Sequence, residues 1–186
     1  MKLIRLAKLT LALAPLASCA SPRHTAWHAY EKGNYAGAAE RWSELALAGD
    51  ADAQFLLGLV HDEGQLGEAD ANEAVRWYAL AAEQGHVAAQ CNLGLCHYEG
   101  RGTLRSHERA AQWFERAAAQ SFAEAQNNLA VMHLLGQVSD ATPERARELL
   151  AQAAAGGDPK ALSLLPKLAA LAPDAPREQV LAAIAR

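Results

Sequence analysis

The stretch that decides the fold is Ala89–Ser121, AQCNLGLCHYEGRGTLRSHERAAQWFERAAAQS. An altered form of this stretch occurs once before it and once after it, at a constant spacing of 36 residues. The aligned positions include Ala53, Ala89 and Ala125; Leu57, Leu93 and Leu129; Gly64, Gly100 and Gly136; and Ala74, Ala110 and Ala146. A strict period of this length indicates a repeat array, in which equivalent residues occupy equivalent places.

Each repeat has a pattern that predicts two helices. In the first repeat, Ala53, Leu57 and Val60 fall on one helical face, and Gly64 then provides a helix stop. A second apolar pattern, which contains Trp77, follows a column of residues whose side chains can cap a helix. These capping residues are Asp70, Ser106 and Thr142. Two helices of about 13 residues per repeat are therefore expected.

Columns of small and large residues indicate how these helices pack. Gly58, Gly94 and Ala130 would let the helix backbones approach each other closely. The large residues that we expect to fill the space between helices are Leu57, Leu93, Leu129, Trp77 and Trp113.

The first repeat, with AQFLLGLVHDEG at 53–64 and DANEAVRWYALAAEQGH at 70–86, resembles the Sel-one-like repeat (SLR). This family is a relative of the tetratricopeptide repeat (TPR). Its pattern is Ala, Leu-Gly, a Tyr three residues on, a Gly-x-Gly turn, Lys-Ala, a Trp, and Ala-Ala-Glu-Gln-Gly. The resemblance implies an all-α fold, a right-handed α-solenoid of antiparallel helix pairs. It also implies an adaptor rather than an enzyme.

Three repeats carry this resemblance, over 51–86, 87–122 and 123–158, and the third matches less well. The chain departs from the family pattern at the Tyr position, which holds His61, His97 and His133, and at the Trp position of the third repeat, which holds Leu149.

The N-terminal residues 1–18 are predicted to be a lipoprotein signal peptide. Three basic residues precede a short apolar run, residues 9–16, which is too short to span a membrane. The following string, Leu-Ala-Ser-Cys, resembles the bacterial lipobox and implies lipid attachment at Cys19. The alternative is an ordinary signal-peptidase site nearby. Ala20 after the cysteine implies the outer membrane, and we expect the protein to face the periplasm.

The remaining segments flank the three repeats. We expect a tether over 19–25, a divergent N-terminal repeat over 26–50 with Tyr30 in the histidine column, and C-terminal capping helices over 159–186. In the last segment, Pro166 is expected to break or kink a helix. A helix that binds a partner is the alternative interpretation of 159–186.

Charge argues against one class of partner. The formal net charge is −4, and the predicted mature chain has no basic run. Such a chain is a poor nucleic-acid binder. The membrane contact that we expect is through the lipid, because no other stretch is long and apolar enough to span a bilayer.

The histidine column invites a metal interpretation, which the geometry disfavours. Equivalent positions in stacked repeats lie about 9–10 Å apart, whereas one Zn²⁺ needs nitrogens at about 2.0–2.1 Å from the metal. We therefore expect no metal and no cofactor. Each of His61, His97 and His133 is expected to replace the family Tyr, packing between helices with a ring N–H bonded locally.

The cysteines of the second repeat are not expected to pair. Cys91 and Cys96 are five residues apart on one predicted helix, which places their Cα atoms beyond disulfide reach. Cys96 is expected in the core. Cys91 shares its column with Phe55 and Asn127, which leaves its exposure, and a reactive thiol there, open.

Sequence signatures of catalysis are missing. No serine has a lysine three residues later, and Gly-x-Ser-x-Gly does not occur. We therefore expect a non-catalytic adaptor in the cell envelope that binds a protein or peptide. The alternatives are a periplasmic hydrolase acting on cell-wall material and a structural or host-facing surface lipoprotein.

The partner is predicted to bind a concave face formed by the first helix of each repeat. The two asparagines Asn92 and Asn128 could pair with the backbone of an extended peptide, or they could simply face solvent. Leu59, Leu95 and Val131 would form an apolar floor, and Glu99 an acidic rim that favours a basic or neutral guest. The predicted partner-binding residues are Phe55, Leu59, Cys91, Asn92, Leu95, Tyr98, Glu99, Asn127, Asn128 and Val131.

Overall fold

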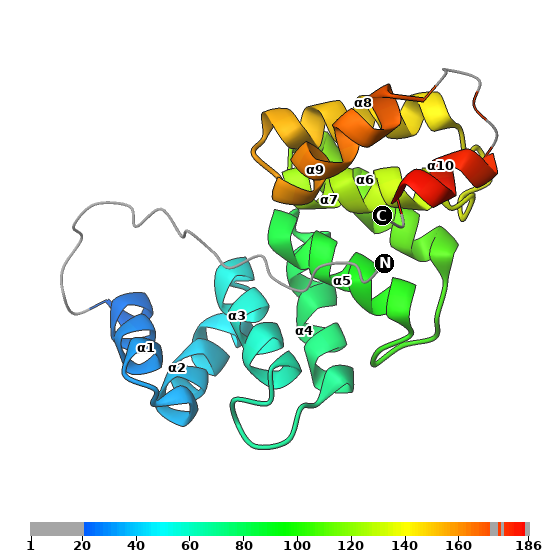
Figure 1. The fold of residues 1–186 in the computed structure, drawn as a ribbon. Coiled ribbons are helices and arrows are strands. Elements are labelled where there is room, and N and C mark those ends of the chain that lie inside the picture. Colours follow the sequence, from blue (N-terminus) through cyan, green and yellow to red (C-terminus); the bar gives the residue numbers. More distant parts are fainter. Residues whose placement is uncertain (1–20, 172–174, 176, 185–186) are drawn as a thin grey trace. The chain divides into compact units, whose positions relative to one another are not determined.

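The computed structural model describes residues 21–171, 175 and 177–184. Figure 1 labels its helices: α1 (Pro22–Glu31), α2 (Tyr35–Leu47), α3 (Ala51–Asp62), α4 (Ala71–Glu83), α5 (Val87–Glu99), α6 (His107–Ala119), α7 (Ala123–Leu134), α8 (Pro143–Ala155), α9 (Pro159–Ala169) and α10 (Arg177–Ile184). The described residues form helices and loops, so the all-α prediction is confirmed. The predicted signal peptide and Cys19 lie outside the described residues.

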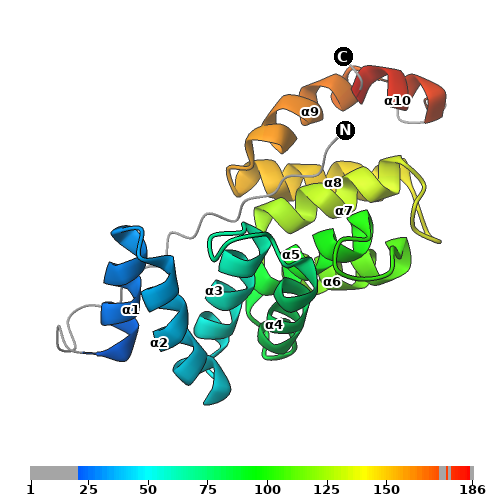
Figure 2. The same ribbon diagram turned by 90° about the horizontal axis from the view of Figure 1, so that it is seen from below.

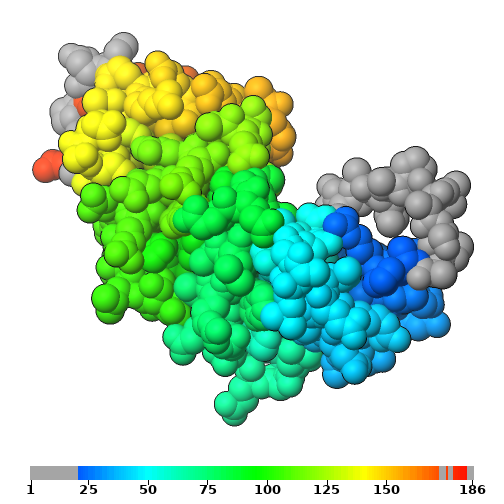
Figure 3. Space-filling view, turned by 180° about the vertical axis from the view of Figure 1, so that it is seen from behind, coloured from blue at the N-terminus to red at the C-terminus, as the bar shows by residue number. Residues whose placement is uncertain are grey.

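The helices form two compact units. In the first unit, over residues 21–105, each of the helices α2 to α5 packs against the helix that precedes it (Figure 2). In the second unit, which begins at Ser106, helices α6 to α9 also pack in sequence order, and α10 packs against α9 and α7. Within its unit, the loop that joins α3 to α4 extends past the helix ends (Figures 1 and 3). Among the described residues, no helix has the length and apolar character needed to cross a membrane.

The second helix of each repeat begins where the capping column predicts. Asp70 Oδ1 accepts hydrogen bonds from the backbone N–H groups of the second and third helical residues of α4. Ser106 Oγ and Thr142 Oγ1 do the same at the third helical residues of α6 and α8. These side chains satisfy N–H groups that have no partner inside the helix.

A column of glutamines joins the first helix of each repeat to the helix that precedes it. The side-chain nitrogens of Gln54, Gln90 and Gln126 donate to the carbonyls of Ala46, Ala82 and Ala118, at 3.0, 3.1 and 3.3 Å. Each carbonyl lies in the last turn of a helix, where it also accepts the backbone N–H of the residue three positions on. The Ala-Gln pair of each repeat therefore has a structural role.

The central fillers are not the predicted tryptophans. Trp77 and Trp113 are half-buried, and Trp113 packs beneath Arg116, whose guanidinium carbon lies 4.4 Å from the ring centroid. The neighbouring residues Tyr78 and Phe114 are fully buried instead. The prediction for the tryptophans is wrong because successive helical residues point in different directions. The buried column, spaced by one repeat, is Trp42, Tyr78, Phe114 and Leu150.

Two expectations at the ends of the chain need correction. Helix α1 begins at Pro22, capped by Ser21 Oγ, so residues 22–25 are helical rather than a tether. Helix α9 continues through Pro166 to Ala169, so the predicted break is wrong. The proline costs a hydrogen bond, and burial of Leu164 and Leu168 keeps the segment helical around it.

Candidate functional site

The ten predicted partner-binding residues differ widely in exposure. Leu59 and Tyr98 are half-buried, and Glu99, the last residue of α5, is exposed. The other seven are buried: Phe55, Cys91, Asn92, Leu95, Asn127, Asn128 and Val131. The members from α3 and α5 lie in the first unit, and those from α7 lie in the second unit. Asn92 and Asn128 are 8% and 0% exposed, so the alternative that they simply face solvent is wrong.

Helix α7 carries two side-chain oxygens that lack a hydrogen-bond partner within the described part of the chain. They are Glu124 Oε1 and Asn127 Oδ1, three residues apart on neighbouring positions of one helix face. Asn127 is only 3% exposed. An unsatisfied buried acceptor costs about 1–3 kcal/mol. Both atoms therefore favour a ligand that supplies hydrogen-bond donors.

The carboxyl of Glu124 is held close to its neutral form. Burial and, to a smaller extent, the negative charge of Asp158 together raise its pKa to about 7, and Lys160 acts in the opposite direction. Asp158 is fixed beside it because its Oδ1 caps α9, accepting from the N–H groups of Lys160 and Ala161. Near neutral pH, the Glu124 carboxyl of α7 is therefore present in both its protonated and its charged form.

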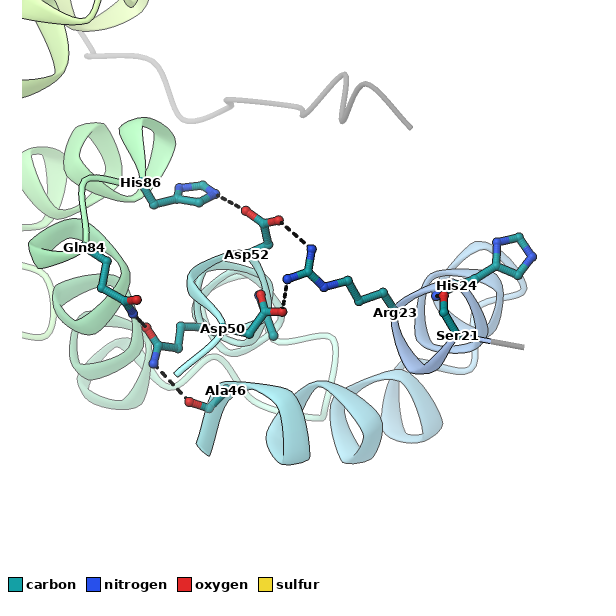
Figure 4. A network of polar contacts seen from close by, with 10 residues as sticks. Ser21, Arg23, His24, Ala46, Asp50, Asp52, Gln84 and His86 are labelled. Carbon is teal, nitrogen blue, oxygen red and sulfur yellow. Dashed lines mark hydrogen bonds and ion pairs between the residues drawn. The ribbon is translucent and has the colours of Figure 1, made fainter. Parts of the chain in front are cut away.

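The equivalent pair in the first unit joins a carboxylate to a histidine rather than to a second carboxyl group. Two repeats before Glu124 and Asp158 stand Asp52 and His86, and His86 Nε2 lies 3.5 Å from Asp52 Oδ1. Figure 4 shows Asp52 between His86 on one side and Arg23 on the other. Arg23 Nη1 lies 3.6 Å from Asp52 Oδ2, and the same guanidinium is paired with Asp50. This network links α1, the start of α3 and the start of α5.

His86 also caps α5. Its Nδ1 accepts the backbone N–H of Ala89 at 3.1 Å, and its ring stacks on that of Phe55 with centroids 4.6 Å apart. Burial lowers the pKa of His86, while Asp52 acts against that shift. The uncharged ring is the form that can accept the Ala89 hydrogen bond. Phe55 therefore lies in a packed core contact rather than in an open groove.

The histidine column is partly as expected. His61 is half-buried, and His97 and His133 are buried. His133 Nδ1 accepts the backbone N–H of Thr142 at 3.4 Å, so this nitrogen is an acceptor rather than the expected donor. Burial lowers the pKa of His133, which favours the neutral ring. Among the described residues, no group of three His, Cys, Asp or Glu side chains could hold a metal ion.

The cysteines of α5 are both core residues. Cys91 and Cys96 are not joined in a disulfide, and each is 0% exposed. Burial of Cys96 confirms its predicted place in the core. The sequence left the exposure of Cys91 open, and the tertiary structure buries this side chain.

The ten predicted partner-binding residues do not include Glu124 or Asp158. A signal was available, since these residues stand in the columns of Asp52 and His86. The contact joins the first helix of one repeat to the start of the next repeat. Comparing those two columns pairs a carboxylate with a second titratable group in the first and third repeats, whereas the second repeat has Ala88 and Phe122 at these positions.

Comparisons with known proteins agree with the repeat boundaries and the fold. A family model described as the Sel1 repeat matches residues 51–86, 87–122 and 123–158. The chain is similar to the crystal structure of a Sel1 repeat protein from Oxalobacter formigenes, with 26% identity and a TM-score of 0.77, over 89% of this chain and 68% of that chain. It is also similar, at 25% identity and a TM-score of 0.45, to a protective antigen of uropathogenic Escherichia coli strains that displays an SLR fold, over 87% of this chain and 44% of that chain. None of the curated proteins matches this chain.

Proposed function

The chain belongs to the Sel1 repeat family, and we propose that it is a non-catalytic adaptor that binds a segment of a partner protein on the first helices of its repeats. Sel1 repeats generally mediate protein–protein interaction. The stacked units of such arrays present extended surfaces that partners can use.

The observation that carries this proposal is the pair of unpartnered acceptors on α7, Glu124 Oε1 and Asn127 Oδ1. An extended peptide has backbone N–H groups that could satisfy both of them once the Asn127 side chain, which is 3% exposed, turns toward the surface. Val131 lies one helical turn beyond Asn127 and is 2% exposed, so it belongs to the same buried face of α7.

The test is a crosslinking pull-down of the full-length protein from membranes, comparing wild type with Asn127→Leu. Leucine has a similar volume and no acceptor, so the variant should fold at least as well as wild type while losing the partner. Asn72→Leu, at an exposed position of α4, is the matched control and should retain the partner. Equal capture by both variants, with thermal unfolding unchanged, would contradict binding at α7.

We also propose that the adaptor is held at the bacterial outer membrane, facing the periplasm, by a lipid on Cys19. The support is the Leu-Ala-Ser-Cys string behind a basic and then an apolar segment. Labelling cells with a palmitate analogue should mark wild type and leave Cys19→Ser unmarked. A label that persists in Cys19→Ser, or its absence from wild type, would overturn the anchor.

A further inference from the structure

An open cavity lies between α1 and α2, in the helix pair that precedes the three matched repeats. Its volume is about 460 Å³. The residues that line it are His24, Thr25, His28, Ala29, Asn34 and Arg41. None of these six is acidic. The repeat pattern does not account for this combination of side chains, because the pair lies outside the matched ranges.

The lining is rich in hydrogen-bond donors. Arg41 Nη1 donates to the carbonyl oxygen of Gly37 at 2.9 Å, which leaves the other guanidinium N–H groups available. Asn34 Oδ1 accepts the N–H of Gly37 at 3.0 Å, which leaves its amide NH₂. His24 and His28 stand one turn apart on α1, with parallel rings whose centroids are 6.5 Å apart. Arginine, amide and imidazole N–H groups thus surround one space.

The positive charge of this cavity is not neutralised. Arg41 has no carboxylate partner within the described residues, whereas Arg23 and Arg76 are each paired with a carboxylate. An uncompensated guanidinium repels a metal cation that the two imidazoles might otherwise chelate. It attracts an anion, and its planar fork suits phosphate oxygens.

We propose that the α1/α2 cavity binds a phosphate group, carried either by a membrane lipid headgroup or by a small soluble phosphate ester. Arg41 supplies the charge, and Asn34, His24 and His28 supply further N–H donors. The first residue that lines the cavity, His24, comes a few residues after Cys19. A chain anchored by a lipid on Cys19 would therefore hold the cavity near the lipid headgroups.

The test is calorimetric titration of the purified full-length protein with inorganic phosphate at constant ionic strength. Wild type should bind phosphate saturably at millimolar concentrations. Arg41→Gln, and separately the double variant His24→Gln/His28→Gln, should each weaken binding by about tenfold or more. Arg76→Gln removes the same charge from α4 and should bind like wild type.

Cosedimentation with phosphatidylglycerol or phosphatidylcholine vesicles distinguishes the two sources of phosphate. Binding to vesicles that Arg41→Gln loses would assign the cavity to headgroups, and binding of inorganic phosphate alone would assign it to a soluble ester. Circular dichroism should show the same helix content in every variant. Absence of saturable phosphate binding, or equal binding by wild type and Arg41→Gln, would overturn the proposal.

Discussion

Tyr78 of α4 lies directly against Gly58 of α3. A Cβ atom placed on Gly58 would stand 2.5 Å from Cδ1 and 2.6 Å from Cε1 of the Tyr78 ring. The ring is fully buried, it lies 5.8 Å from the Phe55 ring between centroids, and its hydroxyl donates to Asp62 at 3.4 Å. Because Gly58 has no side chain, it leaves the space that the buried Tyr78 ring occupies.

Gly58→Ala should destabilise the protein even though alanine favours helices. The added methyl group cannot fit without moving a ring that is packed on all sides, and such overpacking costs about 1–3 kcal/mol. Urea unfolding followed by circular dichroism measures the loss. Gly58→Ala combined with Tyr78→Leu should cost less than the sum of the two single changes, and strict additivity would contradict the contact.

Tyr78→Ala and Trp77→Ala should differ in cost although the residues are adjacent. Removing the fully buried Tyr78 should cost about 3–5 kcal/mol, because it leaves a cavity in the core. Removing the half-buried Trp77 should cost less, because part of this side chain already meets solvent. Denaturation midpoints of the two variants give the comparison directly. A larger loss in Trp77→Ala would show that the assignment of the core column is wrong.

Glu124→Gln should stabilise the protein at alkaline pH. The pKa of Glu124 is raised in the folded state from 4.5 to about 7, so the folded chain binds the proton more tightly than the unfolded chain. The free energy of unfolding therefore decreases as pH rises from about 4.5 to about 7. The variant carries no titrating group there, so its advantage over wild type should be about 1–2 kcal/mol at pH 8 and small at pH 4.

The readout for Glu124 is the free energy of unfolding of both proteins across this pH range. Asp158→Asn offers a second check, because removing the neighbouring charge should lower the pKa of Glu124 while retaining a residue that can cap α9. A constant difference between wild type and Glu124→Gln at every pH would argue against the shifted titration.

His86→Asn should reduce the sensitivity of the first unit to acid. The pKa of His86 is lowered in the folded state, so the unfolded chain takes up the proton first and stability falls as pH decreases below about 6.5. Asparagine can cap α5 without titrating. Stability measured between pH 7 and pH 5 should therefore fall less in the variant. Parallel pH profiles would show that His86 does not carry this dependence.

Much of the candidate site could be assigned to helices from the sequence, but its accessibility could not. The 36-residue period placed Asn92, Asn127 and Asn128 on first helices correctly. Their burial depends on what packs over each helix face, which a period along the chain does not report. The raised pKa of Glu124 has the same origin, because it depends first on the burial of its carboxyl and then on the approach of Asp158 from the next helix pair.

The sequence by itself determined the local structure of this protein, since capping residues such as Asp70, Ser106 and Thr142 act on backbone groups within a few residues. It also determined the repeat, because equivalent residues recur at one spacing. Only the tertiary structure decided whether Trp77 or Tyr78 fills the core and which acceptors remain unsatisfied. These outcomes depend on the angle and rotation with which one helix packs on another, and neighbouring side chains on a helix point about 100° apart.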